Sequence, residues 1–244
     1  MQTLHLEQAG PVAQVILSRP DQRNAMSPAL MAELTDCLTR FDHDPAVRVI
    51  VISGAGRGFC AGSDLAALAA MDSAGKHAFE AASGKLARMI WALETPVIAA
   101  VAGFAIGGGL TLATSCDLVV TAPAAKWSLP EVPIGLFPAW GIDSVVIRTG
   151  KQRARRLCWG IDTLDRTGAA DFGLADMVAD DPLATALDLA DRLAALPPES
   201  ARAVKRYFAP VGPGEAEDTA ANALFTGCCE TPEATASFTR FGKG

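Results

Sequence analysis

The hydrophobic pattern along the chain changes its period several times. Residues 12–17 and 47–53 form short runs rich in valine and isoleucine, which predict buried β-strands. Between them, Ser27 followed by Pro28 is typical of a helix start, because serine caps the first turn and proline fits its first position. The apolar spacing beyond Pro28 predicts a helix that ends at about residue 42.

The alternation of strands and helices continues through the middle of the chain. The predicted strands cover residues 96–101, 117–121 and 127–129. Three helices are predicted here. A short one begins at about Leu65, with Asp64 as its cap, a second covers residues 74–93, and a third begins at about Leu110. Strands and helices that alternate at this length favour βαβ-like units with parallel strands.

Beyond about residue 140 the pattern becomes helical. The predicted helices cover residues 141–149, 151–159, 182–196, 199–208, 215–229 and 232–241. We therefore expect an α/β core over residues 1–180, which binds substrate and carries the catalytic site, and a helical oligomerisation region over residues 181–244.

Composition and charge limit the classes of function. The 244 residues are 50% hydrophobic and 20% charged, which excludes a disordered chain. The formal net charge of −6 argues against a nucleic-acid backbone as the main ligand, so no nucleic-acid partner is expected. A basic run at Lys151, Arg153, Arg155 and Arg156 is expected to be a solvated helix face or a subunit contact.

The cysteines and the first residues indicate a cytoplasmic protein. The six cysteines contain no C-x-x-C pair, and a chain of this length has enough core to fold without disulfides. The three histidines match no metal-binding spacing, so no metal is expected. The first ten residues show neither a basic segment nor a long apolar run, so no signal peptide is predicted.

One long uncharged stretch, residues 95–116, has the composition of a membrane span. Pro96 near its start, the three consecutive glycines from Gly107 and the lack of a basic flank argue against that interpretation. A buried strand that leads into a buried helix explains the stretch better, so no membrane partner is expected.

Two glycine-rich segments, residues 54–63 and 103–109, each follow a predicted strand and lead into a predicted helix. Glycine lets a ligand approach the backbone N–H groups at such a helix start, where negative charge is favoured. Two N–H groups that converge on one point would form an oxyanion hole. Plain structural turns are the alternative at this stage.

The first glycine-rich segment also fits a dinucleotide-binding fingerprint, G-x-G-x-x-A, over residues 56–61. The predicted helix begins later than the fingerprint requires, and no acidic residue ends a second strand about twenty residues on. A nicotinamide-dependent oxidoreductase is therefore the rival at the level of the fold, and retention of NAD(H) by the protein would distinguish it.

A single glutamate, Glu131, stands in the apolar segment 127–137. Desolvation by such neighbours would raise the pKa of its carboxyl toward the range that is useful for proton transfer. An exposed loop glutamate is the alternative.

Taken together, these segments resemble the enoyl-CoA hydratase/isomerase (crotonase) superfamily. The matching residues follow the family's order over residues 12–180 and comprise residues 17–20, 24–26, 58–65, 95–109, 116–118 and 129–135. The resemblance implies an α/β fold with a spiral of ββα units, and a C-terminal helical region that forms trimers or dimers of trimers. It also implies an acyl-CoA thioester as substrate, with coenzyme A as part of that substrate and no separate cofactor.

The resemblance also implies roles for individual residues. By position, the backbone N–H groups of Ser63 and Gly108 form an oxyanion hole for the thioester oxygen, on which an adjacent enolate carries its charge. Glu131 is the implied catalytic base. The implied substrate-binding positions are Arg23, as a partner for the CoA phosphates, Ala25, Ala61, Asp64, Leu65, Thr111 and Trp140.

One position departs from the hydratases of this family, which use two glutamates. The first of these, two residues after the glycine triplet, is Thr111 here, and only the second is present, as Glu131. Hydration needs two carboxyl groups to activate water and deliver a proton, whereas a double-bond shift needs one base that moves a proton between carbons. The pattern therefore resembles Δ3,Δ2-enoyl-CoA isomerases, some of which carry an aromatic residue where Trp140 stands.

Two alternatives remain open from the sequence. One is a hydratase or another crotonase-type reaction with a different second acid, for which Asp143 is the first candidate. The other is a non-catalytic oligomer that binds acyl-CoA. The sequence also leaves open whether Arg240, in the terminal helix, reaches the site.

Overall fold

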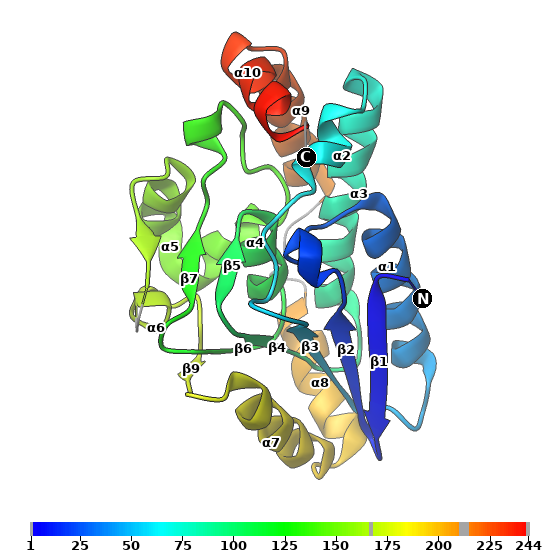
Figure 1. Ribbon diagram of the computed structural model, residues 1–244. Helices are drawn as coiled ribbons and strands as arrows, with labels where there is room; N and C mark the ends of the chain where they lie inside the picture. Colours follow the sequence, from blue (N-terminus) through cyan, green and yellow to red (C-terminus); the bar gives the residue numbers. More distant parts are fainter. Residues whose placement is uncertain (1, 166–167, 210–214, 243–244) are drawn as a thin grey trace.

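The main sheet has six strands and is largely parallel. The computed structural model describes residues 2–165, 168–209 and 215–242 (Figure 1). The strand order is β1 (Leu4–Ala9), β2 (Val12–Leu17), β3 (Val49–Gly54), β4 (Val97–Val101), β6 (Leu118–Thr121) and β9 (Met177–Val178). Only the β1–β2 hairpin is antiparallel, so the crossovers from β2 onward carry helices, as the alternating pattern predicts.

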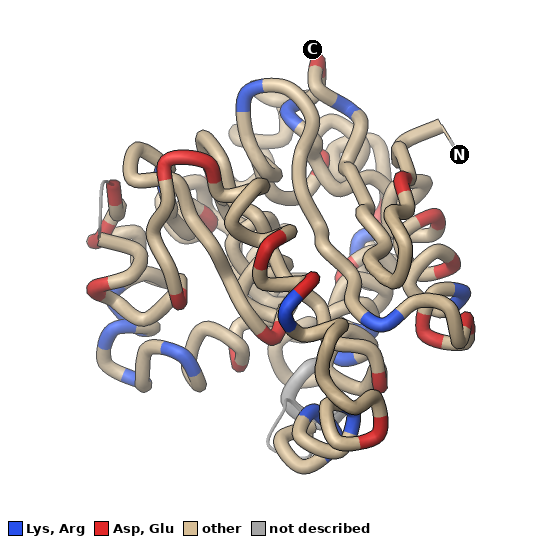
Figure 2. The backbone as a smooth tube through the Cα atoms, turned by 90° about the horizontal axis from the view of Figure 1, so that it is seen from below, with Lys and Arg blue, Asp and Glu red and all other residues tan. Residues whose placement is uncertain are grey.

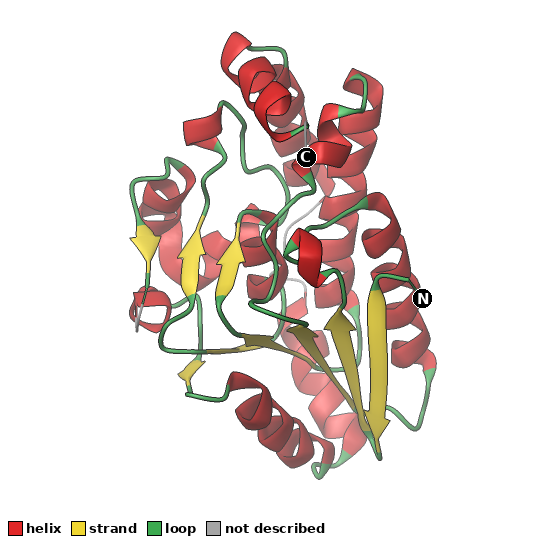
Figure 3. Cartoon of the chain, in the orientation of Figure 1, coloured by secondary structure: helices red, strands yellow, loops and turns green. Residues whose placement is uncertain are grey.

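A second, smaller sheet lies beside the first (Figure 3). It contains β5 (Phe104–Ile106) and β7 (Lys126–Ser128), which are parallel, and β8 (Thr163–Leu164), which is antiparallel to β7. Strands of two or three residues carry too little periodicity to be recognised, and the sequence predicts only the one at 127–129.

The continuous hydrophobic runs of the central strands are explained by burial on both faces. In β3, Ile50 and Ile52 belong to the large core cluster, whereas Val49 and Val51 belong to a second cluster on the opposite face. That second face is covered by helix α7 (Pro182–Ala194) through its buried alanines. Helix α7 is therefore part of the α/β core, although it lies beyond the boundary expected at residue 180.

The helices on the other face begin where the sequence predicts. Helix α1 (Pro28–His43) starts at Ser27, whose Oγ accepts a hydrogen bond from the backbone N–H of Leu30 at 3.2 Å. The remaining elements are η1 (Pro20–Gln22), α2 (Leu65–Ala69), α3 (Ser73–Ala92), α4 (Gly108–Thr114), η2 (Val132–Ile134), α5 (Ile142–Cys158), α6 (Gly168–Phe172), α8 (Pro198–Phe208), α9 (Glu215–Cys229) and α10 (Pro232–Phe241). Gly150 interrupts α5 with a φ of 77°, which matches the two separate helices predicted there.

The C-terminal helices pack onto the core of their own chain. Helix α9 lies against α3, and α10 lies against α2 and η2 (Figure 1). Within α9, Phe225 is 3% exposed whereas Leu224 is 56% exposed. Some apolar side chains of this region are therefore buried within a single chain, and only the exposed ones are available for a contact between subunits.

A buried ion pair fastens α8 to the sheet. The Lys205 Nζ lies 2.7 Å from Asp117 Oδ2 and donates hydrogen bonds of 3.0 Å to the carbonyls of Ile90 and Thr95. Three acceptors around one ammonium group compensate for its removal from water.

Acidic and basic residues are interspersed along the backbone (Figure 2). In the basic run, Arg153 donates to two carbonyls of α6 and Arg156 pairs with Asp162 at 2.8 Å, as expected for a solvated helix face. No helix in the described ranges combines the length and the hydrophobicity that a bilayer span requires.

Candidate active site

The two glycine-rich segments run side by side. A bridge joins Cys60 to Ala105, and the backbone N–H of Ile106 donates to the carbonyl of Cys60 at 3.0 Å. The approach is so close that a Cβ on Gly103 would lie 1.9 Å from the carbonyl oxygen of Arg57. Glycine is required there because any side chain would force the two segments apart.

This contact brings two unused backbone donors to one place. A Cβ on Gly62 would lie 3.2 Å from the backbone nitrogen of Gly108, so the segment ending at Ser63 touches the start of α4. Gly108 is the first residue of α4, where an N–H has no partner within the helix. Within the described residues, neither the Ser63 N–H nor the Gly108 N–H donates a hydrogen bond, and both residues line one cavity.

The carboxyl group of Glu131 lies beside the same helix start. A Cβ on Gly107 would lie 2.5 Å from Glu131 Oε1, so the carboxyl occupies the space that a side chain at 107 would fill. Glu131 as a whole is half-buried, but its Oε2 atom is buried and has no hydrogen-bond partner among the described residues. Desolvation raises the pKa of Glu131 to about 7, as its apolar segment predicts.

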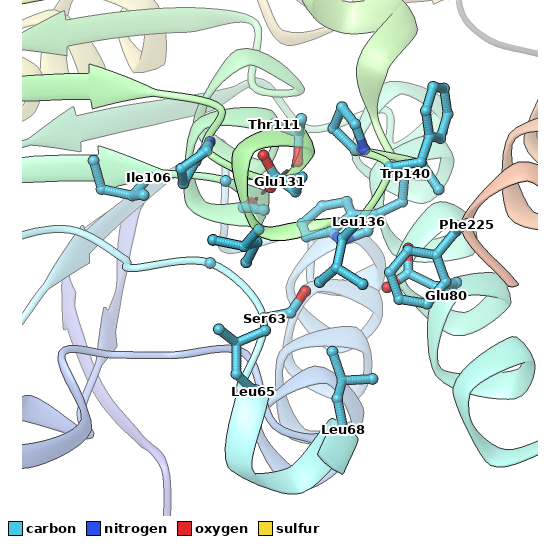
Figure 4. A pocket seen from close by; sticks show the side chains of 18 of the residues that line it. Ser63, Leu65, Leu68, Glu80, Ile106, Thr111, Glu131, Leu136, Trp140 and Phe225 are labelled. Atoms are coloured by element: carbon cyan, nitrogen blue, oxygen red, sulfur yellow. Dashed lines mark hydrogen bonds between the residues drawn. The ribbon is translucent and has the colours of Figure 1, made fainter. Parts of the chain in front are cut away.

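The cavity that these groups line has a volume of about 70 Å³ (Figure 4). The indole of Trp140 covers Gly108, since a Cβ there would lie 2.4 Å from the ring atom Cζ2. Thr111 is buried, and its Oγ1 donates to the carbonyl of Gly108 at 3.1 Å. The predicted residues Ala61, Ser63, Leu65, Gly108, Thr111, Glu131 and Trp140 all line this cavity.

A second carboxyl group, which the sequence motifs do not predict, lines the cavity. Glu80 projects from α3 and is 3% exposed, beside Phe225 of α9 (Figure 4). Desolvation, and secondarily the charge of Glu131, raise the pKa of Glu80 to about 8. A signal exists in the sequence, because Glu80 shares one helix face with the small residues Gly84 and Ala87.

Three of the predicted substrate contacts lie outside the cavity lining. Arg23 is exposed, and its carbonyl accepts from the N–H of Ala61 at 3.1 Å. Ala25 lies on the same segment. The Asp64 carboxylate caps α2 through the N–H of Ala67 and pairs with Arg19 at 2.9 Å, so it has a structural role in this chain.

The other candidate acid and the terminal arginine also lie away from the cavity. Asp143, in the first turn of α5, is partly exposed and does not line the cavity. Arg240 is exposed, and its guanidinium lies over the Phe241 ring, 5.3 Å from the ring centre.

The described residues hold no group of three or more His, Cys, Asp or Glu side chains that could bind a metal ion. All six cysteines are free thiols, three of them buried.

Comparison with known proteins shows similarity to one enzyme family over most of the chain. The sequence model of the family described as enoyl-CoA hydratase/isomerase matches residues 7–240. A probable enoyl-CoA hydratase of Mycobacterium tuberculosis is 39% identical over 198 residues, which are 80% of this chain and 76% of that protein. A crotonyl-CoA hydratase of Syntrophomonas wolfei is 36% identical over 175 residues, 71% of this chain and 67% of that protein.

Solved structures share the fold as well. An enoyl-CoA hydratase/isomerase from Mycobacterium paratuberculosis superposes with a TM-score of 0.90 at 27% identity, covering 98% of each chain. An enoyl-CoA hydratase from Bacillus anthracis superposes with a TM-score of 0.82 at 26% identity, covering 99% of this chain and 96% of that one. These matches confirm the resemblance read from the glycine-rich and Pro-Glu segments: the chain belongs to the enoyl-CoA hydratase/isomerase family, whose enzymes act on acyl-CoA thioesters.

Proposed function

We propose that this protein is an acyl-CoA enzyme that moves a double bond from the 3- to the 2-position of an enoyl thioester, with Glu131 as the base. The observation that carries the proposal is the position of the Glu131 carboxyl. It lies against Gly107, next to the Gly108 N–H, which has no acceptor among the described residues, in a cavity lined mainly by apolar side chains.

The two backbone donors fit the charge that such a reaction develops. When a proton leaves C2 of the thioester, the electron pair moves onto the thioester oxygen. The N–H groups of Ser63 and Gly108 would donate to that oxygen, and fixed donors in a cavity lined mainly by apolar side chains stabilise it more strongly than water does. Each such donor contributes about 3–4 kcal/mol to the transition state.

The proton is carried by Glu131 alone in this reaction. The carboxylate takes the proton from C2, the C3=C4 bond becomes C2=C3 through the enolate, and the same carboxyl returns the proton to C4. A carboxyl with a pKa of about 7 suits both steps, because it gains and loses a proton at similar cost near neutral pH. The reaction as proposed uses only backbone N–H groups and one carboxyl, so it requires no cofactor besides the CoA of the substrate.

Substrate binding is proposed along the segments that the family uses. Arg23 is exposed, where its guanidinium can meet the phosphates of CoA, while Leu65 and Trp140 form apolar walls of the cavity. We also propose a homotrimer or a dimer of trimers, which light scattering at micromolar concentration would test; a stable monomer would contradict it.

A second candidate activity is hydration of a 2-enoyl thioester. Its support is Glu80, a second carboxyl group in the cavity, together with the hydratase names of the two relatives given above. The two activities are separable by experiment, because a 3-enoyl-CoA reports the double-bond shift and a 2-enoyl-CoA reports the addition of water.

The deciding experiment compares wild type with Glu131→Gln on both substrates. The variant keeps the size of the side chain and removes proton transfer, so the double-bond shift should fall at least about a hundredfold while acyl-CoA binding is retained. A variant with near-normal turnover would show that Glu131 is not the base. A wild type that binds acyl-CoA without turning over either substrate would support a binding protein instead.

A further inference from the structure

The proposed double-bond shift uses Glu131 and does not use the second buried carboxyl group of the cavity, that of Glu80. Glu80 is 3% exposed and lines the same cavity as Glu131. Among the described residues it forms no hydrogen bond and no ion pair with a basic side chain. Burying a carboxyl without such a partner is costly, and the neighbouring buried positions of α3 hold apolar or small residues. A buried Glu80 is therefore consistent with a hydrogen-bonding group that enters the cavity together with the substrate.

The two carboxyl groups reach the cavity from different elements. Glu131 comes from the segment that enters η2, whereas Glu80 comes from α3 on the side of the cavity that Phe225 closes (Figure 4). Leu136 and Trp140 are further lining residues between these elements. A substrate held by its thioester oxygen at Ser63 and Gly108 would therefore have one carboxyl near C2 and room for a second group further along the acyl chain.

The cavity also has room for water. A single water molecule requires roughly 10–15 Å³ of such space, and this cavity has about 70 Å³. The Oε2 atom of Glu131, which has no partner in the part of the chain that the structure describes, provides a hydrogen-bond acceptor for a water molecule there.

We infer that Glu80 supplies the second carboxyl group of a two-acid centre, and that this centre adds water across the double bond of a 2-enoyl-CoA thioester. This inference rests on the oxyanion hole and on the role of Glu131 in the proposed function. It adds a reaction that one carboxyl does not support. It would also allow hydration in a chain that has Thr111 at the position of the usual first glutamate.

The reaction balances within the pair. The water oxygen forms a bond to C3 while Glu80 takes one proton from that water, and the C2=C3 electron pair moves through C2 onto the thioester oxygen. The enolate then collapses, and C2 takes a proton from Glu131, whose carboxyl lies against Gly107, beside the proposed oxyanion hole. Glu80 now holds the proton that Glu131 has lost. Transfer of this proton back to Glu131 through water in the cavity restores the starting state.

The pKa values of the pair permit this exchange. Both carboxyl groups have a raised pKa, about 8 for Glu80 and about 7 for Glu131, and the charge of Glu131 contributes to the shift at Glu80. Both groups therefore exchange protons near neutral pH, and hydration proceeds from the fraction of the protein in which Glu131 holds the proton and Glu80 is ionised.

The experiment measures hydration of crotonyl-CoA and isomerisation of a 3-enoyl-CoA separately for wild type, Glu80→Gln and Glu131→Gln. Wild type should catalyse both reactions. Glu80→Gln should lose hydration at least about a hundredfold and keep isomerisation within about threefold, whereas Glu131→Gln should lose both. The exposed Glu230 provides the matched control, since Glu230→Gln changes the same atoms outside the cavity and should leave both rates unchanged.

The other possible results distinguish an error in the role of Glu80 from an error in the proposed function. Hydration by Glu80→Gln within threefold of wild type, or a wild type that isomerises without hydrating, would overturn the role of Glu80 and leave the proposed function intact. Equal loss of both reactions in a folded Glu80→Gln would also overturn it, because Glu80 would then act on the whole site. Glu80→Asp, which retains a carboxyl, should keep more hydration than Glu80→Gln. Unchanged isomerisation in Glu131→Gln would instead refute the proposed function.

Discussion

The carboxyl group of Glu131 occupies the space that a side chain on Gly107 would fill, with Oε1 only 2.5 Å from the position of the missing Cβ. Gly107 has a φ of 55° and directly precedes helix α4, so one backbone position permits both the sharp turn into the helix and the approach of the base. The glycine triplet is therefore needed for the placement of Glu131 as well as for the access of a ligand to the backbone.

This relationship predicts the effect of Gly107→Ala. The added methyl group should displace the Glu131 carboxyl and reduce the double-bond shift by about a hundredfold, since misplacement of about 1 Å has an effect of this size. Backbone strain should lower the free energy of unfolding by about 1–3 kcal/mol. Steady-state kinetics and urea unfolding measure the two effects.

Gly10→Ala is the matched control for the backbone strain. Gly10 has a similar φ of 57°, but no atom lies within 4 Å of its Cβ position. This variant should lose about 1 kcal/mol of stability and keep full activity. If Gly107→Ala were equally active, the contact with Glu131 would have no role in placing the base.

The pKa of Glu131 predicts the pH dependence of the double-bond shift. Only the ionised carboxylate can take the proton from C2, so kcat/KM should fall as the pH drops through about 7, approaching tenfold for each pH unit below it. A kcat/KM that stays constant between pH 5 and 8 in the folded enzyme would contradict this. Circular dichroism at each pH distinguishes the titration from unfolding.

The raised pKa of Glu80 predicts a pH-dependent cost in stability. Between the ordinary value of 4.5 and about 8, the folded protein holds a proton on Glu80 that the unfolded chain has released. The folded state therefore binds more protons, and the contribution of Glu80 to stability falls as the pH rises through this window. Glu80→Gln removes that dependence, so its stability relative to wild type should increase from pH 5.5 to pH 8, by an amount on the order of a few kcal/mol.

Urea unfolding of both proteins at the two pH values measures this difference. Glu230→Gln, which changes an exposed carboxylate, should follow wild type at both pH values. Parallel stability curves for wild type and Glu80→Gln would show that Glu80 titrates normally in the folded protein.

Thr111→Glu tests whether a carboxyl at that position can replace Glu80. Thr111 lines the cavity, but a Cβ on Gly141 would lie only 2.8 Å from the Thr111 Cβ, so the longer side chain must extend into the cavity. In the Glu80→Gln background, we expect Thr111→Glu to restore measurable hydration, well below the wild-type rate because the pocket beside Trp140 is not shaped for it. Thr111→Gln in the same background is the control, and equal hydration by both double variants would contradict the prediction.

Much of the fold follows from local sequence signals. The valine- and isoleucine-rich runs predict β2, β3 and β4, and Ser27-Pro28 places the start of α1. These elements are predictable because hydrophobic periodicity and helix caps depend on residues within a few positions of one another. The short strands β5, β8 and β9 are not predictable in this way, since their pairing partners determine them.

The sequence by itself determined the family, the two glycine-rich segments and Glu131, because these lie in contiguous motifs with fixed spacing. Only the tertiary structure decided which other side chains enter the cavity. Glu80 and Phe225 lie 145 residues apart in the chain, and they meet there because α9 packs against α3. Whether a glutamate on an amphipathic helix is an ordinary surface carboxylate or a buried acid depends on what covers it. Burial and the neighbouring charge set its pKa, and packing between distant elements produces both.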